Sequence, residues 1–328
     1  MSRRVRALGN RNFPWTSLDP DRRNAVLLLG GIGIVIVLAL GLIGYGYYSD
    51  RIAPKHDTVL KVGDRNFDYA LVERRARAEL VRGRIDTSKL GDSLYAVVVT
   101  IQREEILRQA AVTIGLTVSG DEIEARYAVR LALQKEASRE LLASRLRDDL
   151  LRTGLSLSEY RDITEAEVLE RKMRDQFESK VPAEAEFVDL RLIESRTQAE
   201  ALKAKERLDR GEKFSLVAVD VSIDPSGKTN AGDLSWTPRG ALQKQVEEVA
   251  FSLAAGSRSD VIEADEGFFI VESAGKETRA VNSDAKNTIV QRSIADLLGE
   301  TRKRIGTEIT MTTRQIQKLA SSVSAPVG

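Results

Sequence analysis

A long uncharged run of hydrophobic residues lies near the start of the chain. Residues 25–48 read AVLLLGGIGIVIVLALGLIGYGYY, and a helix of that length, at about 1.5 Å per residue, crosses a hydrocarbon core of about 30 Å. Arginines dominate residues 1–24, so the positive-inside rule places that tail in the cytoplasm. We expect a single-pass transmembrane helix over 25–48, with the rest of the chain outside the cytoplasm. A cleaved signal peptide is the alternative, but the run exceeds its usual core of about 7 to 15 residues.

The next part of the chain, residues 57–181, is predicted to be mainly helical. A short strand at 59–62, a turn at Gly63-Asp64 and a helix from about Asp68 open it. The interval up to Pro182 contains no proline, and its apolar residues recur at helical spacing. Cap-type and glycine breaks divide it into about four helices, and they occur at Gly83, Thr87-Ser88, Gly115 with Ser119-Gly120, and 153–158.

The pattern changes after Pro182. Residues 187–193 alternate like a strand, and Thr197-Gln-Ala-Glu200 is a capping box that begins a helix ended by Gly211. A loop over 222–236 leads to a second helix, and residues 267–272 read as a closing strand. Together these elements predict a compact α+β module over 183–277. Residues 282–323 are again helical in pattern, with an apolar face that another element must bury.

Composition excludes several classes of function. Lys and Arg number 50 against 49 Asp and Glu, so the chain lacks the basic excess of a general nucleic-acid binder. It has no cysteine and one histidine, His56, which excludes disulfides, zinc–thiolate sites and any zinc site that needs two or more histidines. Neither a P-loop nor a dinucleotide-binding glycine motif occurs. We therefore expect no cofactor and no metal.

The module carries the pattern of a known family. The segments FVDLRLIES, SIDPSGKTNAGDLSW, AFSLAAG and GFFIV follow one another in Glu186–Gly275, with Ala201, Leu208, Gly211 and Phe214 at a further set of matching positions. This order resembles a parvulin-type peptidyl-prolyl isomerase domain, and the flanking helical segments resemble the SurA/PrsA-type foldases. The resemblance implies an α+β fold in which a transmembrane helix, a SurA-like helical segment and the parvulin module are followed by a C-terminal helix that packs back on the helical segment.

The resemblance also implies site residues. The two positions that usually hold histidine in the family carry Arg191 and Phe269, while Asp224 matches a position that holds cysteine or aspartate; Asp224 and Arg191 are the catalytic candidates. Substrate-binding candidates are Leu242, Val246, Phe251, Phe269 and Trp236. Without the family pattern, Leu242, Val246 and Phe251 would be read as core residues, Asp224 as a turn residue beside Pro225, and Arg191 as a surface charge or a partner of Asp224 or Asp233.

Two functions follow from these observations. The first is a membrane-anchored isomerase that accelerates the folding of exported, unfolded proteins at X-Pro bonds. The second is a non-catalytic holdase that uses the module only to bind peptides, which the absence of both histidines favours. A structural envelope protein that docks a specific partner is a weaker third reading. The expected partners are unfolded or nascent exported chains and the lipid bilayer, with no nucleic acid.

Overall fold

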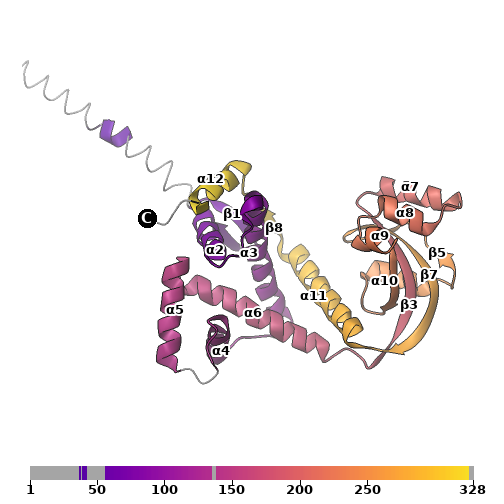
Figure 1. Ribbon diagram of the computed structural model, residues 1–328, viewed down its shortest axis with the longest axis horizontal. Helices are drawn as coiled ribbons and strands as arrows, with labels where there is room; N and C mark the ends of the chain where they lie inside the picture. The colour runs from indigo at the N-terminus through magenta and orange to yellow at the C-terminus, as the bar shows by residue number, and fades with distance from the viewer. Residues whose placement is uncertain (1–36, 38, 43–55, 135–137, 325–328) are drawn as a thin grey trace, which may run out of the picture. The chain divides into compact units, whose positions relative to one another are not determined.

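A computed structural model describes residues 37, 39–42, 56–134 and 138–324 (Figure 1). The transmembrane helix expected over 25–48 lies outside the described residues, apart from a short helical piece at 37 and 39–42. None of the helices in the described ranges is long and apolar enough to cross a membrane. Membrane anchoring therefore stays a prediction.

A small sheet joins the start of the described chain to its end. The predicted hairpin is present as β1 (Thr58–Val62) and β2 (Arg65–Asp68), with Gly63 at a φ of +56° in the turn between them. Strand β8 (Thr307–Ile309) pairs antiparallel with β1, so that Leu60 lies opposite Ile309. The helical pattern of 282–323 is therefore interrupted, which corrects the expectation of one helical segment. Gly306, at a φ of +71°, ends the preceding helix.

Helices fill the interval between the hairpin and Pro182. Most of the predicted breaks are found, because Gly83, Gly115 and Gly154 all adopt positive φ at helix ends and Ser119 and Ser156 form capping boxes. A further break, between α4 and α5, was not predicted, because no glycine or proline marks it. The elements are α2 (Tyr69–Val81), the 3-10 turn η4 (Thr87–Lys89), α3 (Leu90–Thr113), α4 (Gly120–Arg130), α5 (Arg139–Thr153) and α6 (Leu157–Glu178).

Helix α11 (Ser283–Ile305), which follows the α+β module in the chain, packs on α3 and α6. Val290 and Ile294 of α11 belong to one buried cluster with Leu107 of α3 and Met173 of α6, and all four side chains are less than a tenth exposed. This packing buries the apolar face that the sequence left without a partner. Beyond β8, α12 (Thr313–Ser324) contributes the buried side chains of Leu319 and Val323.

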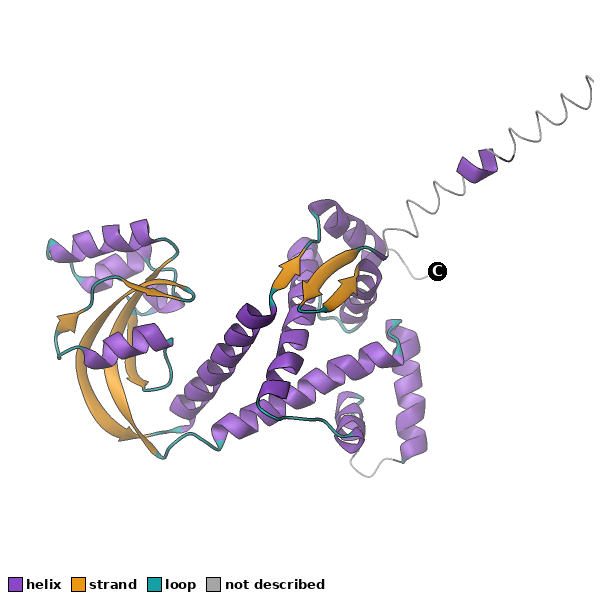
Figure 2. Ribbon diagram, turned by 180° about the vertical axis from the view of Figure 1, so that it is seen from behind, coloured by secondary structure: helices purple, strands orange, loops and turns teal. Residues whose placement is uncertain are grey.

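The α+β module is built on an antiparallel sheet (Figure 2). Its strands run in the order β4-β3-β7-β5, with β6 also paired to β7. The capping box at Thr197 is confirmed, while helix α8 and the short helix α9 were not predicted as separate elements. The elements are β3 (Glu184–Ser195), α7 (Gln198–Asp209), α8 (Phe214–Val221), α9 (Pro225–Thr229), β4 (Asp233–Pro238), α10 (Lys244–Ser252), β5 (Ser257–Arg258), β6 (Ile262–Ala264) and β7 (Gly267–Ala280).

Candidate functional site

The two faces of the module's sheet bury different helices. Val188, Leu190 and Leu192 of β3 share a buried cluster with α10, whereas Ile193 of β3 and Ile270 of β7 share one with α7 and α8. Successive residues of a strand point to opposite faces, which accounts for this division. We call the first face the α10 face.

The apolar candidates divide into buried and accessible side chains. Val246, Phe251 and Phe269 all lie on the α10 face, and they are 1%, 6% and 4% exposed, as core residues are. Leu242 packs against the same cluster but is only partly buried. Burial thus favours the core reading for the first three and leaves Leu242 open to a ligand. Leu234, which was not among the candidates, is also partly buried and packs against the same cluster.

Trp236 lies away from this surface. It is paired in register with Asp189, whereas the next residue of β4, Thr237, is paired with Val188 of the α10 face. The Trp236 ring stacks with the guanidinium of Arg279 at 3.7 Å, and Arg279 lies opposite Ala185 of β3, so it shares the odd-numbered face of that strand. The structure therefore does not bring Trp236 together with Leu242.

Arg191 also lies on the opposite face. Its guanidinium forms an ion pair with Glu272 Oε1 at 3.0 Å, and the two residues are paired in register on β3 and β7. The sequence analysis named Asp224 or Asp233 as possible partners of Arg191, but the carboxylate that pairs with it is that of Glu272. Since Phe269 occupies the α10 face, Arg191 and Phe269, the two positions at which the resemblance implies histidine in the family, lie on different faces here.

A group of acidic side chains lies at one end of the α10 face. Glu194 is paired in register with Phe269, so its side chain lies on the same face. Burial raises the pKa of Glu194, and the charges of Asp224 and Glu266 raise it further. Within the described ranges, Glu194 forms no salt bridge, so no cation offsets these effects.

Two polar residues order the surroundings of Glu194. Asp224 caps α9 by accepting hydrogen bonds from the backbone N–H of Ser226 at 2.8 Å and from its hydroxyl, which is the turn role that the sequence also allowed. Gln243, at the start of α10 and 8% exposed, donates from Nε2 to Glu266 Oε2 at 3.0 Å and accepts from the Glu266 N–H at 3.2 Å. The carboxylates are thus held in place, although they repel one another.

The loop between α9 and β4 is tightly fitted. Gly232 has a φ of +80°, and a Cβ there would come within 2.8 Å of both Ala218 Cβ and Leu192 O. Its carbonyl accepts a hydrogen bond from the Leu192 N–H at 2.8 Å. Ala231 and Ser235 also have positive φ, a conformation that costs energy in residues with a Cβ. The glycine of the Gly232-Asp233-Leu234 motif is therefore required by close packing, and it fixes where Leu234 lies.

Sequence reasoning missed Glu194, Gln243 and Leu234. Glu194 ends an apolar run of β3, which is a weak signal that a charge lies at the end of a strand. Its proximity to Asp224 and Glu266 depends on strand pairing and is not visible in the sequence. In the described part of the chain, no group of three or more acidic or histidine side chains is placed to hold a metal ion.

Known proteins resemble this chain over the same region. Residues 171–277 match the family described as the PPIC-type PPIASE domain. Foldase protein PrsA of Geobacillus kaustophilus is 32% identical over 159 residues, which are 48% of this chain and 53% of that protein. Foldase protein PrsA of Caldanaerobacter subterraneus subsp. tengcongensis is 27% identical over 226 residues, 69% of this chain and 70% of that one.

A solved structure of a PrsA protein is also similar to this chain. The crystal structure of the peptidylprolyl isomerase PrsA from Bacillus anthracis is 20% identical and covers 68% of this chain and 95% of its own, with a TM-score of 0.38. The chain spans about half the length of the first of the curated relatives that it matches. The predicted resemblance to the SurA/PrsA-type parvulin isomerases is confirmed by the match of residues 171–277 to the PPIC-type domain family together with the similarity to the PrsA foldases.

Proposed function

We propose that this chain is a membrane-anchored extracytoplasmic foldase whose PPIC-type domain isomerises X-Pro bonds in unfolded exported proteins. The observation that carries the proposal is the α10 face, where partly buried Leu242 and Leu234 pack against the cluster that contains Phe269, the register partner of Glu194. Asp224 and Glu266 act on the charge of Glu194, and Gln243 holds Glu266. The hydrophobic run at 25–48 supports the anchoring. The PrsA foldases support the assignment of unfolded clients.

The reaction makes few demands on the protein. No covalent bond breaks, and the enzyme must lower a rotational barrier of about 18 to 20 kcal/mol by favouring the twisted amide over the planar one. Twisting removes the resonance that makes the planar amide strongly polar, so an apolar surface such as Leu242 and Leu234 favours the twisted form. Polar groups fixed in advance then stabilise charge that changes during rotation.

Glu194 is the group best placed to supply such an interaction. Its raised pKa increases the share of the protonated carboxyl, which can donate a hydrogen bond, whereas the ionised form only accepts. A donor close to the proline nitrogen stabilises the twisted amide, because the nitrogen lone pair is then no longer delocalised. We assign Leu242 and Leu234 to the proline ring, and Glu194 with Asp224 to the amide.

The test is exchange spectroscopy on a panel of X-Pro peptides with the full chain in a non-ionic detergent. We expect faster cis–trans exchange, and a loss of about tenfold or more in Leu242→Ala, since an apolar pocket contact is worth roughly 10 to 200-fold in discrimination. Leu202→Ala is the matched control, because Leu202 lies on α7 with a side chain that is 47% exposed. Equal rates in the parent, both variants and buffer would contradict the proposal.

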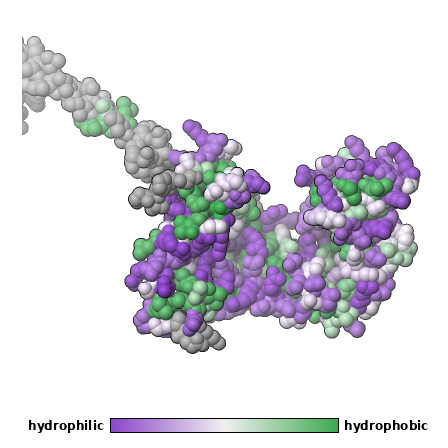
Figure 3. All heavy atoms as spheres, viewed as in Figure 1, coloured by the Kyte–Doolittle hydropathy of each residue, from purple (hydrophilic) through white to green (hydrophobic). Residues whose placement is uncertain are grey.

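A holdase is the second candidate, and a groove in the helical segment favours it. Figure 3 shows hydrophobic side chains gathered over α4 and α5 on an otherwise largely hydrophilic face. The cavity there measures about 440 Å³ and is bordered by apolar residues of α4, α5 and α6. These residues include Ile123, Leu142, Leu146 and Leu157. Arg191 and Phe269, which stand where the resemblance implies histidine, support this reading as well.

Suppression of aggregation separates the two candidates. If the chain is a holdase, it slows the aggregation of an unfolded protein without accelerating X-Pro exchange, and Leu146→Ser in the groove weakens that protection. Leu242→Ala leaves it unchanged. If the PPIC-type domain carries the function, Leu242→Ala slows X-Pro exchange, whereas Leu146→Ser leaves the rate of exchange unchanged.

A further inference from the structure

A second cavity in the helical segment is lined by arginine. It measures about 500 Å³, within the usual size of a small-molecule site, and lies between the residues after α2, the end of α4 and α5. Five guanidinium groups line it, those of Arg82, Arg84, Arg130, Arg145 and Arg152. We call it the arginine pocket. Asp148 and Asp149 also line it, so the positive charges outnumber the negative ones.

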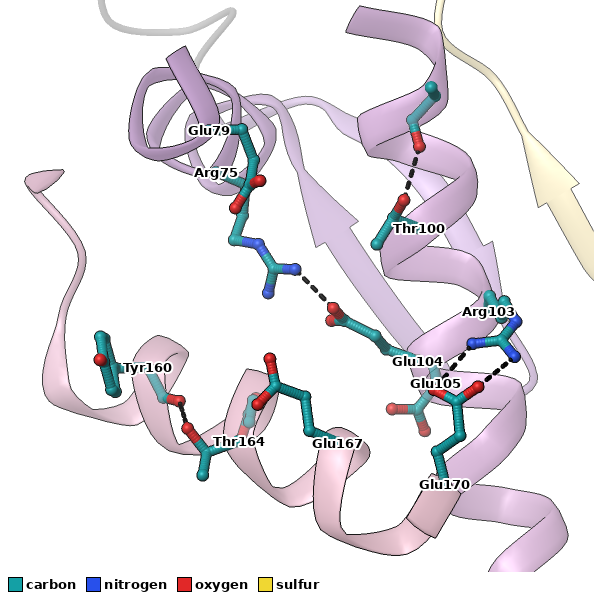
Figure 4. Close-up of polar contacts among 12 residues, drawn as sticks. Arg75, Glu79, Thr100, Arg103, Glu104, Glu105, Tyr160, Thr164, Glu167 and Glu170 are labelled. Carbon is teal, nitrogen blue, oxygen red and sulfur yellow. Dashed lines mark hydrogen bonds and ion pairs between the residues drawn. The ribbon is translucent and has the colours of Figure 1, made fainter. Parts of the chain in front are cut away.

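Two of the arginines are buried and held rigidly. The side chains of Arg82 and Arg130 are each 9% exposed. Arg82 pairs with Asp149 at 3.0 Å, and Arg130 pairs with Glu167 of α6 at 2.6 Å. Both guanidinium carbons lie over the ring of buried Tyr160, at 5.8 and 5.0 Å from its centroid. Figure 4 shows Tyr160 and Glu167 on the same helix, α6. The charge of this wall is therefore fixed before any ligand arrives.

The acids near the pocket do not satisfy all of these donors. Nε of Arg130 is buried and has no hydrogen-bond partner, although a buried N–H nearly always has one. Glu167 is shared, because it also pairs with Arg126 at 2.7 Å. Arg145 forms no ion pair among the described residues. These donors are therefore available to an anion.

We propose that the arginine pocket binds a phosphate group carried on a small molecule. Guanidinium forks match the oxygens of phosphate and of carboxylate in pairs, but a phosphate offers three or four oxygens and up to two charges to a wall of several forks. The volume exceeds that of the bare ion, which leaves space for the rest of the molecule. This site is separate from the PPIC-type domain and does not depend on its activity.

The test is isothermal titration of the full chain in a non-ionic detergent at constant ionic strength. The probes are inorganic phosphate, pyrophosphate and glycerol phosphate, with acetate and succinate as carboxylate probes. We expect one phosphate probe to bind per chain, and glycerol phosphate or pyrophosphate to bind more tightly than the free ion. Tight binding of the free ion alone would identify inorganic phosphate as the source.

Two variants on α5 test whether binding depends on the arginine pocket. Arg145→Ala is expected to weaken binding about tenfold or more, since a charge-assisted hydrogen bond is among the strongest kinds. Arg147→Ala, two residues away on α5 and exposed, does not line the pocket and is expected to bind as the parent does. Both arginines are exposed, so neither variant is expected to disturb folding.

Three results would overturn the proposal. They are no binding of any phosphate probe at millimolar concentration, equal binding by the Arg145→Ala variant, and binding of succinate as tight as that of pyrophosphate. The last result would instead identify a carboxylate ligand, such as an acidic peptide segment.

Discussion

Partly buried carboxylates have lowered pKa values in the helical segment but a raised pKa in the PPIC-type domain. In the helical segment, burial alone would raise the pKa of Asp149, but hydrogen bonds from Arg152 and Arg82 keep it below its usual value. Glu159 behaves in the same way, since burial is outweighed by Arg74 and by the cap at Ser156. In the PPIC-type domain, burial raises the pKa of Glu194, and the nearby acids add to the rise.

The difference lies in the partners and not in burial. A desolvated carboxylate is stable where a guanidinium lies within hydrogen-bonding distance, and it tends toward the neutral acid where only other carboxylates are near. Paired charge in the helical segment therefore stabilises the fold, whereas Glu194 lacks such a partner among the described residues, which is typical of groups that take part in chemistry. The following variants test this contrast.

The largest effect is expected from removing a buried cation in the helical segment. Arg75 pairs with Glu104 at 2.6 Å, and the two side chains are 8% and 14% exposed (Figure 4). Arg75→Ala leaves Glu104 buried without its partner, and such a loss costs about 3 to 5 kcal/mol. Urea unfolding followed by circular dichroism measures the change in the free energy of unfolding.

The matched control for this variant is Arg103→Ala. Arg103 of α3 pairs with Glu170 of α6 at 2.7 Å (Figure 4), but the side chains are 49% and 37% exposed. An exposed pair is worth about 0 to 1 kcal/mol. Similar losses in the two variants would mean that burial does not govern the strength of these pairs.

The next effect is steric and concerns the loop of the candidate site. Gly232→Ala combines a φ of +80° with close contacts at 2.8 Å to Ala218 and Leu192. The conformation alone costs about 1 to 2 kcal/mol, and the contacts raise the loss further and displace Leu234. In Gly211→Ala the φ is +87° but nothing lies within 4 Å of the new Cβ. We expect a smaller loss in the free energy of unfolding for Gly211→Ala, and urea unfolding of both variants measures the difference. Equal losses would show that the loop around Gly232 relaxes to accommodate the new Cβ.

Rising pH is expected to change the stability contributions of Glu194 and Glu159 in opposite directions. Because the folded pKa of Glu194 is raised, the native state holds more protons than the unfolded state as pH rises above the ordinary value of about 4.3. Glu194 therefore lowers stability at pH 7, and Glu194→Gln gains stability relative to the parent between pH 4 and 7. Glu159 has a lowered pKa, so its contribution is present above about pH 4.3 and is lost as pH falls.

The comparison variant is thus Glu159→Gln, which loses stability relative to the parent at pH 7 and approaches it at low pH. Free energies of unfolding at pH 3, 4, 5.5 and 7 resolve both trends. The same sign in both variants would contradict the contrast between paired and unpaired carboxylates.

Local signals made much of the fold predictable. The turn at Gly63, the capping box at Thr197 and the glycines that end helices depend on a few neighbouring residues, and all were found in place. The break between α4 and α5 was missed because it depends on neither glycine nor proline. The interruption at β8 was missed because its strand forms only by pairing with β1, about 250 residues earlier in the chain.

The candidate site was less predictable. The family pattern identified Leu242 and Asp224, which lie on or beside the surface that the structure describes. It could not reveal that Arg191 and Trp236 lie on the other face of the sheet, because that depends on how β3 pairs with β4 and β7, which are distant in the sequence. Glu194 could be identified only from the structure, because strand pairing and the loop bring it near Asp224 and Glu266.

The smallest effect is expected from Arg191→Ala, and it separates the two faces of the sheet. Arg191 is 49% exposed and pairs only with Glu272 among the described residues, so its removal is expected to cost no more than about 1 kcal/mol. If the α10 face carries catalysis, the variant retains the parent's rate of X-Pro exchange, whereas Glu194→Gln changes that rate and its dependence on pH. Exchange spectroscopy at pH 5 and pH 7 on the parent and both variants gives the comparison. A large loss of rate in Arg191→Ala with unchanged stability would instead place the reaction on the opposite face of the sheet, where Arg191 lies.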